Sequence, residues 1–243
     1  MSLPKIDLPV YTTNIHSKKL PIQFTPFTVK ESTILMMAKE SGEVQAMIDA
    51  IRQILTNCLV DKSIVVNKLP MIDLEWLFIQ IHSKSSGETV PLHFKCKNIT
   101  NKETVTECGM ILQCEIDLRN IKYEPLPKDY GRFMLTEHIG IQMKLPTFEA
   151  TQKALNVPQS LQDHMLAGMC IDYVFDETTV TNADDAEPEE LMEFVQGIEL
   201  ANFNKIKDFL DEVPTIKYVI ETTCGKCDYH HNIVLEGLAD FFE

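Results

Sequence analysis

Two cysteines near the end of the chain have the spacing of metal ligands. Cys224-Gly225-Lys226-Cys227 lies between two runs of residues that favour β-strands. Two thiolates separated by two residues at a turn can share one tetrahedral metal ion, and such a pair is half of a structural zinc site. The sequence therefore predicts two ligands for a structural Zn²⁺ ion here, and a closed site needs two more.

The predicted second half of the site is Cys96 and Cys108, at the two ends of a polar loop. These side chains lie close together if the strands that flank the loop form a hairpin. Eleven residues separate them, which is not the spacing of a zinc knuckle. His230 and His231 are candidate substitutes. In the alternative interpretation all four cysteines are reduced thiols, with Cys96 and Cys108 packed as small hydrophobic side chains.

Other chemistry has less support in the sequence. A thioredoxin-like site places its first cysteine at a helix N-terminus, whereas the residues after Cys227 favour a strand. The sequence motifs of serine hydrolases, zinc proteases and phosphate-binding loops do not occur, and the histidines are scattered. The acidic run Asp184–Glu187 could bind a cation, although such a run is more often simply solvated. We therefore expect no catalytic residues and no enzyme.

Composition excludes several classes of partner. Of the 243 residues 44% are hydrophobic and 24% are charged, which is ordinary for a globular protein. The formal net charge of -14 repels nucleic acid and anionic membranes. No stretch approaches the roughly 20 apolar residues of a membrane span, and the first residues lack the apolar core of a signal peptide. We therefore expect a cytoplasmic protein whose seven cysteines are reduced.

Periodicity predicts the elements that must position these residues. Ile6–Phe27 favours a β-hairpin, and Thr28 with Glu31 forms a capping-box pattern that opens a helix ending at Gly42. Apolar residues at helical spacing predict further helices at Glu43–Leu59, Ile72–Lys84, Phe148–Leu155, Leu161–Phe175, Pro188–Gly197 and Leu200–Glu212. Strands are predicted at Thr89–Lys97, Met110–Leu118, Glu137–Lys144, Thr215–Thr223 and Asn232–Glu236, with loops at Asn98–Glu107 and Thr181–Glu187.

This order of elements predicts an α+β fold. It has an N-terminal β-hairpin and helices, a central antiparallel sheet, a helical section and a C-terminal Cys-x-x-Cys hairpin. The corresponding regions are 1–87, 88–147 and 148–243, which can also form one compact unit. Three aromatic residues are candidates for binding a partner. Trp76 lies off the apolar stripe of its helix, and Phe241 and Phe242 need a surface to cover them.

Several segments resemble the T4-type phage baseplate hub protein family. They are Phe24–Glu31, Ile34–Ser41, Ala50–Cys58, Asp73–Ile79, and the Cys224-x-x-Cys227 motif together with the ending Leu235–Phe242. The resemblance implies a non-enzymatic protein that acts in assembly of the baseplate hub through contacts with other hub proteins. It implies a place in the host cytoplasm during assembly, and also in the virion tail baseplate if the chain is a permanent subunit. It leaves open whether the chain is a hub subunit, which could form homo-oligomers, or an assembly chaperone absent from the virion.

Two hypotheses outside this family remain at this point. The chain could be a zinc-stabilised protein-interaction module unrelated to phages. It could also be a thiol oxidoreductase that uses Cys224 and Cys227, in which case Cys224→Ser would abolish reduction of a disulfide substrate.

Deletion of Phe241 and Phe242 is expected to weaken hub assembly or solubility, because these two large rings dock on the chain's own body or on a neighbour. The measurements are pull-down of hub proteins and thermal melting of the truncated chain. Unchanged values in both would contradict the prediction.

Overall fold

The computed structural model describes residues 6–101, 106–123, 126–127 and 129–237, which form two compact units. The first unit contains Met1–Ile64, Leu74–Glu124 and Thr215–Glu243, and the second contains Val65–Asp73 and Pro125–Pro214. The three regions predicted from the sequence, 1–87, 88–147 and 148–243, are consecutive, whereas each compact unit combines separate segments of the chain. The three regions stay a prediction. In the described residues no helix combines the length and the apolar character that crossing a membrane requires. The predicted α+β class is confirmed.

Helices α2 (Val44–Cys58) and α3 (Met71–Ser86) supply many of the buried side chains of the first unit, which also contains α1 (Val29–Ser41). Helix α1 begins with the predicted capping box, in which the Glu31 carboxylate accepts a hydrogen bond from the Thr28 N–H. It ends at Gly42, whose left-handed φ of 67° a residue with a side chain rarely adopts. The side chains that are fully buried on α2 and α3 include Ile54, Leu55, Leu77, Phe78, Ile79 and Ile81.

The predicted N-terminal hairpin is present as β1 (Tyr11–Thr13) and β2 (Ile22–Phe24). Backbone hydrogen bonds join its second strand to the end of α2, from Thr25 N to Cys58 O and from Val60 N to Gln23 O. The Phe24 side chain is buried. The hairpin is therefore part of the helical core rather than a separate arm.

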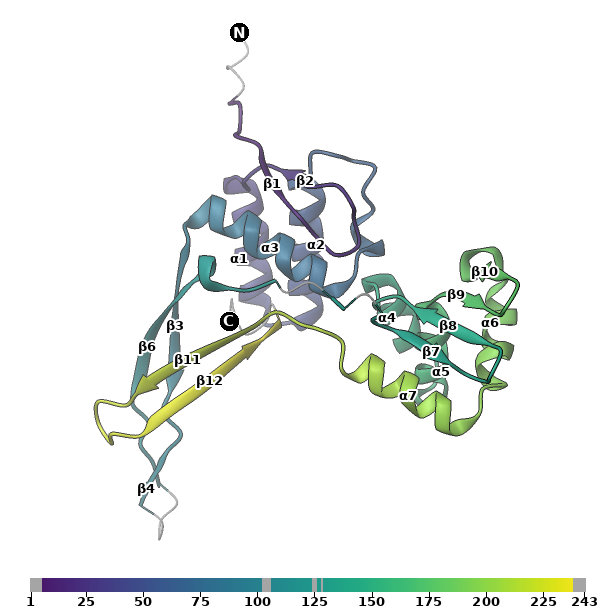
Figure 1. Cartoon of the computed structure of the whole chain (residues 1–243). Coiled ribbons are helices and arrows are strands. Elements are labelled where there is room, and N and C mark those ends of the chain that lie inside the picture. Colours follow the sequence, from purple (N-terminus) through teal and green to yellow (C-terminus); the bar gives the residue numbers. More distant parts are fainter. Residues whose placement is uncertain (1–5, 102–105, 124–125, 128, 238–243) are drawn as a thin grey trace. The chain divides into compact units, whose positions relative to one another are not determined.

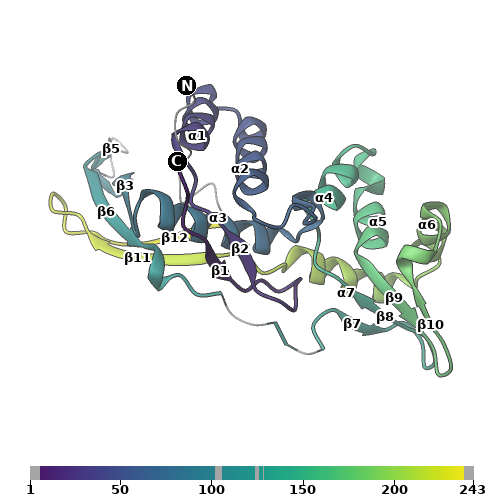
Figure 2. The same cartoon turned by 90° about the horizontal axis from the view of Figure 1, so that it is seen from above.

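Two longer hairpins extend from the same unit and lie side by side (Figures 1 and 2). One pairs β3 (Thr89–Lys95) with β6 (Ile111–Asp117), and the other pairs β11 (Lys217–Thr223) with β12 (His230–Glu236). Exposed and buried residues alternate along β3 and β6, so each of these strands has one buried and one solvated face. Beyond β3 and β6 the chain forms a short pair, β4 (Ile99–Asn101) with β5 (Thr106–Glu107).

The second unit is built on a four-stranded antiparallel sheet of order β10-β9-β8-β7. Its strands are β7 (Arg132–Met134), β8 (Gly140–Met143), β9 (Ile171–Phe175) and β10 (Val180–Asn182). Its helices are α4 (Phe148–Leu155), α5 (Gln159–Cys170), α6 (Pro188–Gln196) and α7 (Leu200–Asp211). Side chains from the sheet and from α5, α6 and α7 form one core, with Ile141, Cys170, Val195, Ile206 and Phe209 among its members.

The structure corrects several details of the prediction. The predicted helix Leu161–Phe175 ends at Cys170, because Ile171–Phe175 is rich in β-branched and aromatic residues and pairs with β8. The predicted loop Asn98–Glu107 contains β4 and β5, and the loop Thr181–Glu187 contains part of β10 and a short 3₁₀ helix. The three predicted central strands all form, but they divide between the β3–β6 hairpin and the sheet of the second unit.

Glu75 on α3 is a buried carboxylate that holds the base of the C-terminal hairpin. Its Oε2 accepts a hydrogen bond of 2.9 Å from the N–H of Ile216, the residue before β11. At the end of β12, Gly237 N donates to Ile216 O. A Cβ on Gly237 would lie 3.2 Å from the other Glu75 oxygen, so the glycine permits this close approach. Burial raises the pKa of Glu75 to about 7, against the lowering effect of the Ile216 N–H.

The raised pKa of Glu75 predicts a pH-dependent stability. The folded chain binds this proton more tightly than the unfolded chain, so the stabilisation is lost as the pH rises from 4.5 through about 7. Glu75→Gln, which mimics the protonated carboxyl, is expected to match the wild type near pH 4.5. At pH 8 its free energy of unfolding should be higher by about 3 kcal/mol.

Urea unfolding at several pH values measures this difference. Glu115→Gln, at an exposed position on β6, is the matched control and should show no such trend. A constant difference between Glu75→Gln and the wild type over this pH range would contradict the raised pKa.

Candidate metal centre

The four cysteines predicted as metal ligands converge at one point in the first unit. The Sγ atoms of Cys96, Cys108, Cys224 and Cys227 all lie within 4.8 Å of one another. The Cys96–Cys227 and Cys108–Cys224 pairs are each 3.7 Å apart. A tetrahedral ion with metal–sulfur bonds of about 2.3 Å needs sulfur atoms about 3.8 Å apart. Disulfide sulfurs are about 2.05 Å apart, so the cluster has the spacing of metal ligands and not of bridges.

Cys96 and Cys108 are brought together by the predicted hairpin. Cys96 follows β3 directly, and its N–H donates to Met110 O at 2.8 Å while its carbonyl accepts from Gly109 N at 3.0 Å. Cys108 N donates to Asn98 O at 2.8 Å. Gly109 has a φ of 68°, which permits the turn after Cys108. The eleven-residue spacing thus reflects the β4–β5 pair inserted between two cysteines that are neighbours across the hairpin.

Cys224 and Cys227 lie in the turn between β11 and β12. The Cys224 carbonyl accepts a hydrogen bond from Asp228 N, and the Cys224 N–H donates to Tyr229 O, both at 2.9 Å. Asp228 has a φ of 52°, a left-handed conformation that Asp and Asn adopt more readily than most residues. The residue after Cys227 therefore turns the chain in the same way as Gly109 does after Cys108.

Hydrogen-bond donors are directed at several of the sulfurs. The backbone N–H of the residue two positions later donates to Cys96, Cys108 and Cys227, from Asn98, Met110 and Tyr229. The side-chain amide of Asn98 also donates to Cys227 Sγ at 3.5 Å. Such donors stabilise a thiolate, which is the form that binds metal.

The pKa values of Cys96, Cys108 and Cys227 shift in different directions, because burial raises the pKa of a thiol and hydrogen-bond donors lower it. The Asn98 amide, together with the Tyr229 N–H, lowers the pKa of Cys227 to about 6. Burial raises the pKa of Cys96 to about 12. The Met110 N–H lowers the pKa of Cys108, but burial and neighbouring thiols outweigh it, so the net direction is upward. A divalent cation would favour the thiolate at every position, because its charge offsets their mutual repulsion.

The predicted substitute ligands His230 and His231 lie beside the cluster rather than in it. His231 Nε2 is 3.1 Å from Cys96 Sγ, a hydrogen-bond distance. His230 Nδ1 lies 2.8 Å from Thr223 Oγ1 across the hairpin. Within the described residues, the four cysteines are the one group of His, Cys, Asp and Glu side chains close enough to hold a metal. In the acidic run, Asp184 forms a salt bridge of 3.3 Å with Lys144.

Of the three residues predicted to bind a partner, the structure describes only Trp76. The Trp76 indole stacks on Tyr123 with ring centroids 4.8 Å apart and donates a hydrogen bond of 2.9 Å to Thr13 Oγ1. It is therefore half-buried within its own unit. Phe241 and Phe242 lie outside the described residues. Their binding role, and that of Trp76, stays a prediction.

Sequence reasoning missed the contribution of Asn98 to this centre. The turn after Cys108 did have a signal in the sequence, because Cys108 is followed directly by Gly109. The side-chain contact from Asn98 to Cys227 spans 129 positions in the chain and has no local signal.

Comparison with known proteins places the chain in a family. A family model described as T4 bacteriophage base plate protein matches residues 8–243. The chain belongs to this base plate protein family. It is 24% identical to the baseplate hub assembly protein gp26 of Enterobacteria phage T4, over 89% of this chain and 90% of that protein. No solved structure gave a significant match. The resemblance seen in the sequence is thus confirmed, and the hypothesis of a module unrelated to phages loses its support.

This base plate protein, purified under reducing conditions without chelator, is expected to contain one metal ion per chain. The Cys224→Ser variant should not bind the ion. Its free energy of unfolding should be lower than that of the wild type by at least about 3 kcal/mol, because metal binding adds to folding stability. Elemental analysis and urea unfolding provide the two measurements. Cys114→Ala, in the same β3–β6 hairpin but outside the cluster, is the control that should keep the ion. Wild-type protein without bound metal would rule out the site.

Proposed function

We propose that this chain is a non-enzymatic protein of the phage baseplate hub that acts in hub assembly through protein–protein contacts. The main observation that supports this proposal is the similarity to the T4 baseplate hub assembly protein, which extends over nearly the whole length of both chains. A match of this extent is what a shared architecture would give, rather than one shared motif. The proposed partners are other proteins of the same baseplate hub.

Exposed apolar side chains on α1 support a role in binding other proteins. Val29, Met36 and Met37 are 83%, 60% and 65% exposed, although they lie on a regular helix. Large exposed apolar side chains on one element are typical of surfaces that a partner covers. Methionine suits such a surface because its flexible side chain adapts to different shapes.

The distribution of ionisable side chains supports a non-enzymatic role. Four histidines that could serve as general bases lie on separate elements: His82 on α3, His93 on β3, His138 after β7 and His164 on α5. Burial lowers the pKa of His82 to about 4, and His138 lies 2.7 Å from Glu177 on the exposed surface. General acid–base catalysis needs such groups to converge on one reacting atom.

The proposed cofactor is a structural Zn²⁺ ion. Four cysteine ligands leave no open position for a substrate, which is typical of structural zinc sites. Zinc accepts tetrahedral thiolate coordination and has no redox chemistry of its own. Its role would be to join the end of the β3–β6 pair, where Cys96 and Cys108 lie, to the turn between β11 and β12, so that the two hairpins keep a fixed arrangement.

A second candidate is an assembly chaperone that leaves before the virion is complete. The net charge of -14 favours it, because strong self-repulsion keeps a protein soluble before it meets its partner. Both candidates would be present in the host cytoplasm during assembly. Only a permanent subunit would also remain in the baseplate of the finished virion.

Phage that lacks this gene is expected to produce no complete baseplates, because the hub would lack a protein required to bring its parts together. Electron microscopy of infected lysates, with and without the gene on a plasmid, provides the test. Complete baseplates in the mutant lysate would refute the proposed function.

Mass spectrometry of purified virions separates the two candidates in the same experiment. Peptides of this chain at a stoichiometry comparable to other hub proteins would identify a permanent subunit. Their absence from virions, together with a requirement for the gene, would identify a transient assembly factor.

A further inference from the structure

A hollow in the second unit has the size of a binding site. It lies between the turn that joins β7 to β8 and the corner between α6 and α7, with a volume of about 560 Å³. Pockets for side chains or small ligands are typically about 300 to 1,000 Å³. The residues that line it are Leu135, Thr136, Ile139, Glu190, Glu193, Phe194, Gly197, Ile198 and Glu199.

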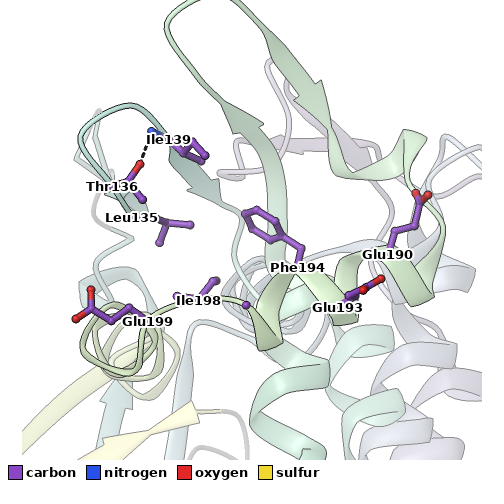
Figure 3. A pocket seen from close by; sticks show the side chains of 9 residues that line it. Leu135, Thr136, Ile139, Glu190, Glu193, Phe194, Ile198 and Glu199 are labelled. Carbon is purple, nitrogen blue, oxygen red and sulfur yellow. Dashed lines mark hydrogen bonds between the residues drawn. The ribbon is translucent and has the colours of Figure 1, made fainter.

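The floor of the hollow is apolar. Leu135, Phe194 and Ile198 are half-buried and rest on the core of the unit, and Figure 3 shows them turned toward one another. Ile139 at the edge is 39% exposed. A large apolar side chain entering from outside would cover these groups and gain roughly 25 cal/mol for each Å² removed from water.

The rim of the hollow is acidic. Glu199 lies at one side, and Glu190 and Glu193 lie at the other (Figure 3). None of the described residues that line the hollow carries a basic side chain. Within the part of the chain that the structure describes, none of the three carboxylates forms a salt bridge. The Glu190 carboxylate accepts a hydrogen bond of 3.3 Å from the Glu187 N–H at the start of α6, whereas the Glu193 and Glu199 side chains are exposed. Exposed carboxylates beside an apolar floor favour a cationic and apolar occupant.

Hydrogen bonds already hold the walls in place. Leu135 N donates to Ile139 O at 2.9 Å, and the Asn202 side-chain amide donates to Leu135 O at 2.7 Å. The Thr136 hydroxyl accepts from Ile139 N at 3.0 Å. On the other wall Gly197 N donates to Glu193 O. A site whose walls are fixed before binding avoids part of the entropy cost of binding.

We propose that this hollow binds a short segment of a partner protein. The segment places one large apolar side chain on Leu135, Phe194 and Ile198, and flanking Lys or Arg side chains reach the rim. A second copy of this chain is disfavoured because both copies carry a net charge of -14. Identifying the partner as a baseplate protein rests on the proposed function, whereas the recognition chemistry follows from the hollow itself.

Fluorescence anisotropy of the full-length chain with three labelled peptides of equal length tests this chemistry. One peptide combines Leu and Phe with Lys and Arg, the second has Glu in place of the basic residues, and the third has Ser in place of Leu and Phe. Only the first is expected to bind tightly, and added salt should weaken it. Equal binding of the basic and the acidic peptide would overturn the proposal.

Substitutions at the rim localise the binding. The double variant Glu193→Gln/Glu199→Gln is expected to bind the first peptide about fivefold to tenfold more weakly than the wild type, because two charge contacts at the exposed rim are lost. The matched control, Asp208→Asn/Asp211→Asn, removes the same charge from exposed positions on α7 of the same unit and should bind like the wild type. Ile139→Ser should weaken binding by removing an apolar side chain from the edge of the hollow. Equal affinity of the wild type, the double rim variant and Ile139→Ser would exclude the hollow.

The two proposals can fail separately. If the peptide binds as expected while phage without the gene still makes complete baseplates, the assembly role is wrong and the hollow stands. If the gene is required but the peptides do not differ in affinity, the hollow is wrong and the assembly role stands.

Discussion

Four sulfur atoms within 4.8 Å of one another set the main constraint on the first unit. Four thiolates at this separation repel strongly, so the arrangement is stable only if most of them stay protonated or a cation offsets their charge. The turns on both sides serve this arrangement, through the left-handed conformations of Gly109 and Asp228 and the N–H groups directed at sulfur. The C-terminal hairpin is thus fixed at both ends, by Glu75 at its base and by the cysteines at its tip.

The second unit presents a different kind of chemistry. Its sheet and helices share one apolar core, and the hollow between the β7–β8 turn and the α6–α7 corner leaves part of that apolar surface open. Glutamates lie on two sides of the opening, and none of the residues that line it is basic. A baseplate protein with a large negative charge can in this way keep wrong partners away and still attract a basic one. The two units would then contribute a rigid scaffold and a selective contact.

Much of the local structure could be predicted from the sequence. The Thr28 capping box, the Gly42 stop and the helix Phe148–Leu155 appear as predicted, because caps and 3.6-residue periodicity act within a few residues. The predicted helix through Phe175 failed because Tyr173 fits a helical stripe as well as it fits a strand. Backbone pairing with β8 makes Ile171–Phe175 a strand. The missed short strands β4, β5, β7 and β10 have two or three residues each, too few to carry a periodic signal.

The sequence alone determined the candidate ligand types, the Cys-x-x-Cys turn, the acidity and the membership in a baseplate family, because each of these is local or cumulative along the chain. Only the tertiary structure decided that Cys96 and Cys108 complete the cluster. Their approach depends on the pairing of β3 with β6 and on the position of a hairpin more than a hundred residues away. The apolar hollow is likewise absent from any single stretch of sequence. Its floor and rim come from a turn and two helices that packing brings together.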